Sequence, residues 1–142
     1  MSDELDALRQ AVLMGNYAEA LALIDEMDEM SRDDKINKIE SYRRVLLVHL
    51  ITQAAEKRST RSWEVSIRDA LASIVSTNKR RKSGGRYLHD EALRESLGAA
   101  WPRALDRAAM EVFAGMYTAA QLATMVDREV LLEQAFQPIT VF

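Results

Sequence analysis

The sequence contains no cysteine, only two prolines, five glycines and two histidines, and aromatic residues make up 6% of its 142 positions. The absence of cysteine excludes disulfides, thiol nucleophiles and thiolate-bound metals. The scarcity of proline and glycine disfavours an architecture of many short strands, because such strands need frequent turns. No apolar run approaches the ~18 residues that cross a bilayer, so we expect no membrane association.

The composition that is present is typical of a globular protein. Hydrophobic residues make up 48% and charged residues 29% of the chain, which argues against disorder. The formal net charge of -3 gives no general attraction to nucleic acid. The first residues are acidic where a secretory signal is basic and then apolar, so we expect a cytoplasmic protein.

Capping signals and apolar periodicity predict that the chain is helical from its start. A first helix is expected from Ser2, as its N-cap, to Met14, and Gly15 stands where a helix C-terminus often has glycine. Asn16 precedes Glu19 by three residues, the spacing of a capping box that opens a second helix.

A third, long helix is expected at the centre of the chain. Ser31 and Asp34 have the three-residue spacing of a capping box, although aspartate is shorter than the usual glutamate or glutamine. They predict a helix over about 32–57. Within it the segment Val45–Ile51 is apolar on almost every side, with His49 embedded in it. A helix that is apolar all round is normally surrounded by other helices, so this one is expected to organise the core.

The second half of the chain continues the helical pattern. Ser59 or Thr60 begins a helix whose apolar stripe runs to Ile74, and residues 78–86 form the one clear loop. Beyond Asp90 the pattern is helical to Phe113, with either a kink or a new start at Trp101-Pro102. Thr118 with Gln121 forms another capping box, and a short helix is expected near 128–135. The apolar tail 139–142 is expected to pack on the bundle or on a second copy.

These elements predict an all-α fold: an up-down helical bundle with a long central helix and a kinked C-terminal helical half. Short connections between long helices favour antiparallel neighbours. No linker divides the chain, so residues 1–142 are expected to form one domain.

Five segments form a more distinctive pattern. They are an acidic stretch at 25–30, Glu40-Ser41, the histidine-containing block 44–50, the run from Arg58 through Trp63 to Arg68, and the closing segment 127–138. Together they resemble the bacterial family catalogued as domain of unknown function 29. The resemblance covers most of residues 5–138. It implies a helical bundle and no established activity, and Thr52–Glu56 departs from the family, which usually has Lys-Trp and Gln-Pro there.

His49 is the first candidate for chemistry. A histidine among apolar side chains is either a general base, here paired with Glu26 or Asp25 on a neighbouring antiparallel helix, or a structural core residue. The pattern favours the structural role. Neither the Glu-x-x-His pair of di-iron bundles nor His-Glu-x-x-His occurs, and we expect no metal site and no cofactor.

A second candidate is an anion site at the start of the fourth helix. Arg58, Arg61, Ser62 and Arg68 gather where backbone N–H groups and the helix dipole favour an anion. Arg68 adjoins the apolar stripe and is expected to be partly buried. The anion is either a phosphate ligand or, as the pattern favours, the acidic residues 25–29 of the bundle itself.

The loop 79–86 adds five basic residues without an acidic one. Its glycines lack the order of a phosphate-binding Walker motif, and no aromatic residues alternate with the bases. A solvated loop is therefore favoured over a nucleic-acid contact.

The sequence thus predicts a non-catalytic helical interaction module, with a homo-oligomer or a protein as partner. The alternatives are binding of nucleic acid or a phosphate ligand through Arg58, Arg61, Arg68 and the 79–86 loop, and an enzyme with a His49–carboxylate site.

Overall fold

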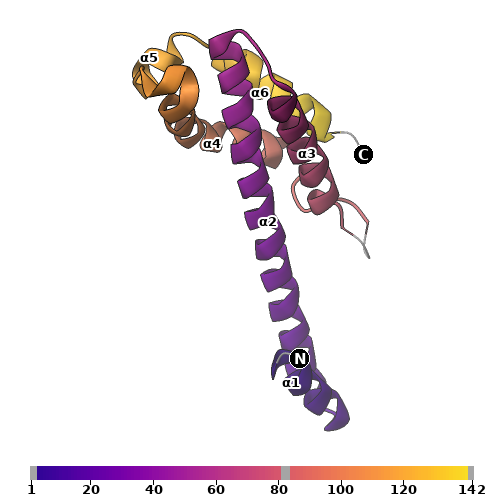
Figure 1. Cartoon of the computed structure of the whole chain (residues 1–142). Helices are drawn as coiled ribbons and strands as arrows, with labels where there is room; N and C mark the ends of the chain where they lie inside the picture. The colour runs from indigo at the N-terminus through magenta and orange to yellow at the C-terminus, as the bar shows by residue number, and fades with distance from the viewer. Residues whose placement is uncertain (1–2, 81–83, 141–142) are drawn as a thin grey trace. The chain divides into compact units, whose positions relative to one another are not determined.

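The computed structural model describes residues 3–80 and 84–140, and over these residues it is an all-α helical bundle without β-strands, which confirms the predicted fold class (Figure 1). An isolated bridge between Lys79 and Arg86 is the only β-type pairing within those ranges. The helices are α1 (Asp3–Leu13), α2 (Tyr17–Glu56), α3 (Arg61–Asn78), α4 (Asp90–Glu111), α5 (Ala119–Ala123) and α6 (Arg128–Phe136), with short 3-10 helices η1 (Val112–Gly115) and η2 (Gln137–Thr140).

Local signals in the sequence set several helix ends. Gly15 has a positive φ of 74°, which glycine adopts without a steric penalty, and it separates α1 from α2. The Asn16 side chain accepts from the backbone N–H of Glu19 at 3.2 Å. Thr118 and Gln121 form a complete capping box at the start of α5. The predicted N-cap Ser2 lies outside the described residues.

The predicted helix break near Ser31 is wrong. Residues Tyr17–Glu56 form one helix of 40 residues, so the second and third predicted helices are a single element, α2. The segment contains no glycine or proline, and a serine with an acid three residues later does not by itself end a helix. Residues 25–29 therefore do not form a separate helix antiparallel to the one that carries His49.

The chain divides into two compact units, one up to Lys35 and one from Ile36 onward. The prediction of one domain over 1–142 stays a prediction. The first unit, here called the N-terminal hairpin (residues 3–35), consists of α1 and the start of α2. Its fully buried apolar residues are two alanines, Ala11 and Ala20. It carries ten acidic and three basic residues.

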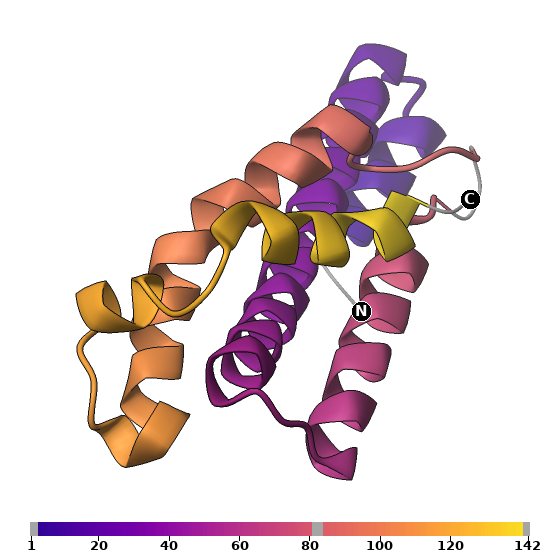
Figure 2. The ribbon, with the colours of Figure 1, turned by 90° about the horizontal axis from the view of Figure 1, so that it is seen from above.

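The second unit, here called the C-terminal bundle (residues 36–140), contains the apolar core. The last part of α2 is at its centre, because Leu46, Leu47 and Ile51 are fully buried against residues of α3, α4 and α6. After the short connection that follows α2, α3 runs back in the opposite direction, and α6 crosses toward α3 (Figure 2). The expectation of burial all round the 45–51 segment is wrong at Val45, which is 42% exposed.

Side chains of α2 and α4 hold these two helices together inside the C-terminal bundle. The Arg43 guanidinium donates to the Ser96 carbonyl oxygen at 2.6 Å and also to the Ser96 hydroxyl. Burial lowers the pKa of Arg43 below its ordinary value, which Glu40 opposes and Arg44 reinforces. Arg43 thus anchors α2 to α4.

The C-terminal half turns after α4 and not at Pro102. Helix α4 continues through Pro102, although the proline lacks the N–H that would bond to the Gly98 carbonyl. The helix ends at Glu111, two residues before the predicted end, and Phe113 and Ala114 have positive φ values of 49° and 56°. In the predicted docked tail, Ile139 is buried, whereas Val141 and Phe142 lie outside the described residues.

Within the part of the chain that the structure describes, no helix combines the length and the apolar character needed to cross a membrane.

Candidate functional site

The predicted arginine cluster begins at the connection between α2 and α3, where Arg58 is already engaged. Its Nε donates to Glu56 Oε1 at 2.8 Å, and its guanidinium lies 4.6 Å from the ring centroid of Trp63. Thr60 is the N-cap of α3 and accepts from the Trp63 backbone N–H. Arg58 therefore has an internal anion, Glu56, and an aromatic partner, whereas the predicted internal pairing named residues 25–29.

Glu56 connects this cluster to the turn after α4. Its Oε2 accepts from the backbone N–H of Phe113 at 3.1 Å, and its side chain is 12% exposed. The bond from Phe113 lowers the pKa of Glu56 below its ordinary value, and Arg58 acts in the same direction against the effect of burial. No local sequence pattern indicates this role of Glu56, because its partner is 57 residues away.

The remaining members of the cluster do not converge with Arg58. Arg61 and Ser62 are the first two residues of α3 and are exposed. Arg68 is exposed as well, so the predicted partial burial is wrong. Arg61 and Arg68 are two turns apart, about 10 Å along the helix axis.

His49 lies at the wall of a pocket between α2 and α4. Its Nδ1 lies 2.8 Å from the Val45 carbonyl oxygen, and since a carbonyl can only accept, Nδ1 carries the proton. The pocket has a volume of about 660 Å³, and the carboxylates that line it belong to Asp106 and Glu111 of α4. Glu26, the predicted partner, is an exposed residue of the N-terminal hairpin.

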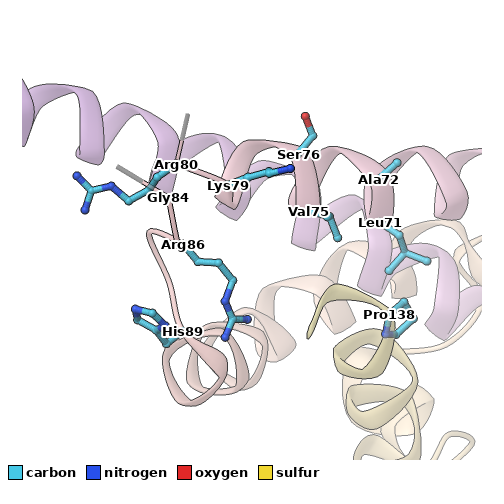
Figure 3. Close-up of a pocket in the computed structure, with 11 residues that line it drawn as sticks. Leu71, Ala72, Val75, Ser76, Lys79, Arg80, Gly84, Arg86, His89 and Pro138 are labelled. Carbon is cyan, nitrogen blue, oxygen red and sulfur yellow. The ribbon is translucent and has the colours of Figure 1, made fainter. Parts of the chain in front are cut away.

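The basic loop borders the largest of the described pockets, which is about 970 Å³ in volume (Figure 3). Lys79, Arg80, Gly84, Gly85, Arg86 and His89 contribute to its wall. Figure 3 shows Leu71 and Val75 of α3 pointing toward Pro138, and these form its apolar side. The predicted loop residues 81–83 lie outside the described residues.

Asn78 shapes this loop and was missed as a functional residue. It is fully buried, its Nδ2 donates to the Leu88 carbonyl at 2.8 Å, and its Oδ1 accepts from the Leu88 N–H at 2.7 Å. The sequence held a signal for this: Asn78 follows Ile74 by four residues on the apolar stripe of α3, a position where a polar residue must find partners. The paired amide closes the loop at the end of α3.

Some of the charged side chains that line this pocket already have partners within the protein. Arg86 donates to Asp90 at 2.6 Å, and the Arg80 guanidinium lies 5.4 Å from the Tyr87 ring centroid. Lys79 is exposed at the rim. The pocket thus combines a basic rim with an apolar side, the arrangement that suits an anion carrying an apolar portion.

Among the residues that the structure describes, no group of three or more histidine, aspartate or glutamate side chains is arranged to hold a metal ion. The arrangements that the structure does contain are an internal Arg58–Glu56–Phe113 network, the His49 pocket and the basic pocket.

Comparison with curated proteins and with solved structures gave no match. The family model described as domain of unknown function DUF29 matches residues 5–136. This range includes the arginine–tryptophan run, the histidine block and all but the last two residues of the closing segment, which together carry the resemblance. The chain therefore belongs to the DUF29 family.

Proposed function

We propose that this protein is a non-catalytic interaction module that self-associates through its N-terminal hairpin. The observation that carries the proposal is the large apolar surface of this small unit. Its exposed large apolar residues are Leu5, Val12, Leu13, Met14, Tyr17, Leu21, Ile24 and Met30. Soluble monomers rarely expose so many neighbouring apolar side chains without a partner.

The part of α2 that belongs to the hairpin has a second apolar face. In α2, Ala20 is buried and Leu23 is partly buried, while Tyr17, Leu21 and Ile24 recur at helical spacing on another side and are exposed. A unit of about 35 residues with so small a core buries little apolar surface when it folds. Units of this size usually need a further source of stability, such as oligomerisation. A partner that covers Tyr17, Leu21 and Ile24 supplies the missing contact.

Charge favours one mode of self-association. The hairpin has a net charge of -7 from ten acidic and three basic residues, whereas residues 36–142 have sixteen basic and twelve acidic residues. Two hairpins face to face bring like charges together. The hairpin of one copy on the C-terminal bundle of another brings opposite charges together, which is a heterologous contact. We therefore favour the heterologous mode.

The test is light scattering and sedimentation velocity over a range of protein and salt concentrations. We expect association that weakens as salt rises, because screening removes the attraction between opposite charges. Leu13→Gln combined with Leu21→Gln should shift the protein toward the monomer, while the matched control Ala22→Gln, at an exposed position on a different side of α2 from Tyr17, Leu21 and Ile24, should not. A wild-type protein that stays monomeric at high concentration would overturn the proposal, and association strengthened by salt would overturn its heterologous mode.

The basic pocket supports a second candidate function, the binding of a phosphate-bearing ligand. The specific observation is that Lys79, Arg80 and Arg86 line one cavity together with an apolar side. This candidate keeps the 79–86 part of the predicted anion site and leaves out Arg58, which already pairs with Glu56.

Fluorescence anisotropy with a labelled single-stranded oligonucleotide, and competition by inorganic phosphate, test this candidate. Binding should fall steeply as salt is added. Lys79→Gln should weaken it, and Arg61→Gln, which removes an exposed arginine at the start of α3, should leave it unchanged. The absence of binding of either probe at low salt would remove the candidate.

A further inference from the structure

A groove between α2 and α4 brings together arginines that the sequence analysis did not single out. Arg44 of α2 and Arg103 of α4 both line two neighbouring hollows of about 410 Å³ and 660 Å³. They therefore stand where the two hollows meet, one on each wall. They are 59 positions apart in the sequence, so only the fold brings them to one place.

These two arginines differ from the other arginines along the groove. Arg43 is held by Ser96, and Arg107 lies 3.8 Å from Glu111 on its own helix. Arg44 and Arg103 are exposed, and neither has a hydrogen bond or an ion pair with a residue that the structure describes. Their donors are available to a ligand.

The groove also has an apolar end. Val45, Val48 and Met110 line the larger hollow, and Met110 is 69% exposed. His49 lines the same hollow, and among the described residues its Nε2 has no hydrogen-bond partner. The larger hollow therefore has the two arginines where it meets the smaller one, and its apolar side chains come mainly from α2, with Met110 from α4.

We propose that this groove is a binding site for a small amphiphilic anion, with a carboxylate or phosphate head held between Arg44 and Arg103 and an apolar body against Val45, Val48 and Met110. Each guanidinium presents a planar set of donors that matches the oxygens of such a head. The anchoring of α2 to α4 through Arg43 and Ser96 fixes the two walls, so the arginines need little rearrangement to bind.

The carboxylates in the groove set the size of the ligand. Glu40 lines the smaller hollow, and Asp106 and Glu111 line the larger one. They oppose an extended polyanion, because a chain of phosphates along the groove has to pass them. A compact head with an uncharged body avoids this repulsion, which excludes nucleic acid as the preferred ligand.

The experiment titrates the whole 142-residue chain with four probes and follows the binding by NMR. The probes are inorganic phosphate, hexanoate, hexyl phosphate and hexanol. Adding hexanoate or hexyl phosphate should shift the side-chain Nε–H resonances of Arg44 and Arg103, and these shifts should reach a plateau as the site fills. The relative affinities of these two probes decide between a carboxylate and a phosphate head. Phosphate alone should bind more weakly, and hexanol should not bind at these arginines.

Arg44→Gln combined with Arg103→Gln should weaken binding by roughly 10-fold to 100-fold, because each lost charge-assisted bond is a large share of the affinity of a small ligand. Both side chains are exposed, so the variant should keep the wild-type melting temperature within a few degrees. Arg61→Gln is the matched control and should leave affinity unchanged. Unchanged affinity in the double variant, hexanol binding as tightly as hexanoate, or no saturable shift with either anionic amphiphile each overturns the proposal. The oligomeric state plays no part in the result.

Discussion

At the scale of single residues, Glu56 links the connection between α2 and α3 to the turn after α4. It is the last residue of α2, and its carboxylate pairs with Arg58 and accepts from the Phe113 backbone N–H. The arginine–tryptophan run that is the most distinctive part of the sequence therefore serves, at Arg58 and Trp63, to hold one carboxylate in place.

The first prediction concerns the pH dependence of this contact. The pKa of Glu56 is lowered in the folded protein, chiefly by the Phe113 N–H. Its stabilising contribution is therefore present above the unfolded-state pKa of about 4.3 and is lost as the pH falls through the lower folded-state pKa. Glu56→Gln should reduce the free energy of unfolding by about 1 kcal/mol at neutral pH, and the difference from wild type should disappear in acid.

Urea unfolding at a series of pH values measures this difference. The control is Glu64→Gln, which removes an exposed carboxylate in the first turn of α3 without a comparable partner. If the Glu56 variant loses the same stability at every pH, the contribution comes from packing and not from charge.

At the scale of elements, the sequence predicts where helices start better than it predicts whether a helix continues without a break. Asn16, Thr60 and Thr118 begin helices as expected, because a cap depends on residues three positions away. The false start at Ser31 has the same local signal, and nothing nearby distinguishes a cap from an exposed serine inside a helix. Whether such a serine caps a helix or lies inside one depends on the tertiary contacts of the segment.

The dependence on local sequence patterns also explains which candidate sites could be predicted from the sequence. Arg58, His49 and the 79–86 loop were identified because each belongs to a compact sequence pattern. Arg44 and Arg103 were not, because their proximity depends on how α2 packs on α4. A sequence without an alignment carries no record of that pairing.

The second prediction concerns the end of α4. Ala114 has a φ of 56°, a left-handed conformation that costs an L-residue about 1 kcal/mol and glycine much less. Ala114→Gly should therefore raise the free energy of unfolding by about 0.5–1 kcal/mol. Thermal unfolding followed by circular dichroism measures it. The control Ala99→Gly, at an exposed position inside α4, should lower stability by about the same amount.

At the scale of the whole molecule, the two units differ in how much apolar surface they bury. The N-terminal hairpin has two fully buried alanines, whereas the C-terminal bundle buries large side chains from several helices, among them Leu46, Ile74 and Leu97. Local stability follows buried apolar contacts. The hairpin is thus expected to open far more often than the bundle, although α2 belongs to both.

The last prediction is that hydrogen exchange will reveal this difference and its dependence on a partner. In dilute protein, amides of residues 5–30 should exchange at least about a hundredfold faster than those of residues 46–51. Raising the protein concentration should slow exchange in the hairpin, because association covers its apolar side chains, and should leave the core unchanged. In the Leu13→Gln, Leu21→Gln variant this concentration dependence should vanish. Hairpin amides that are as protected as the core in dilute wild-type protein would show that the hairpin is stable without a second copy.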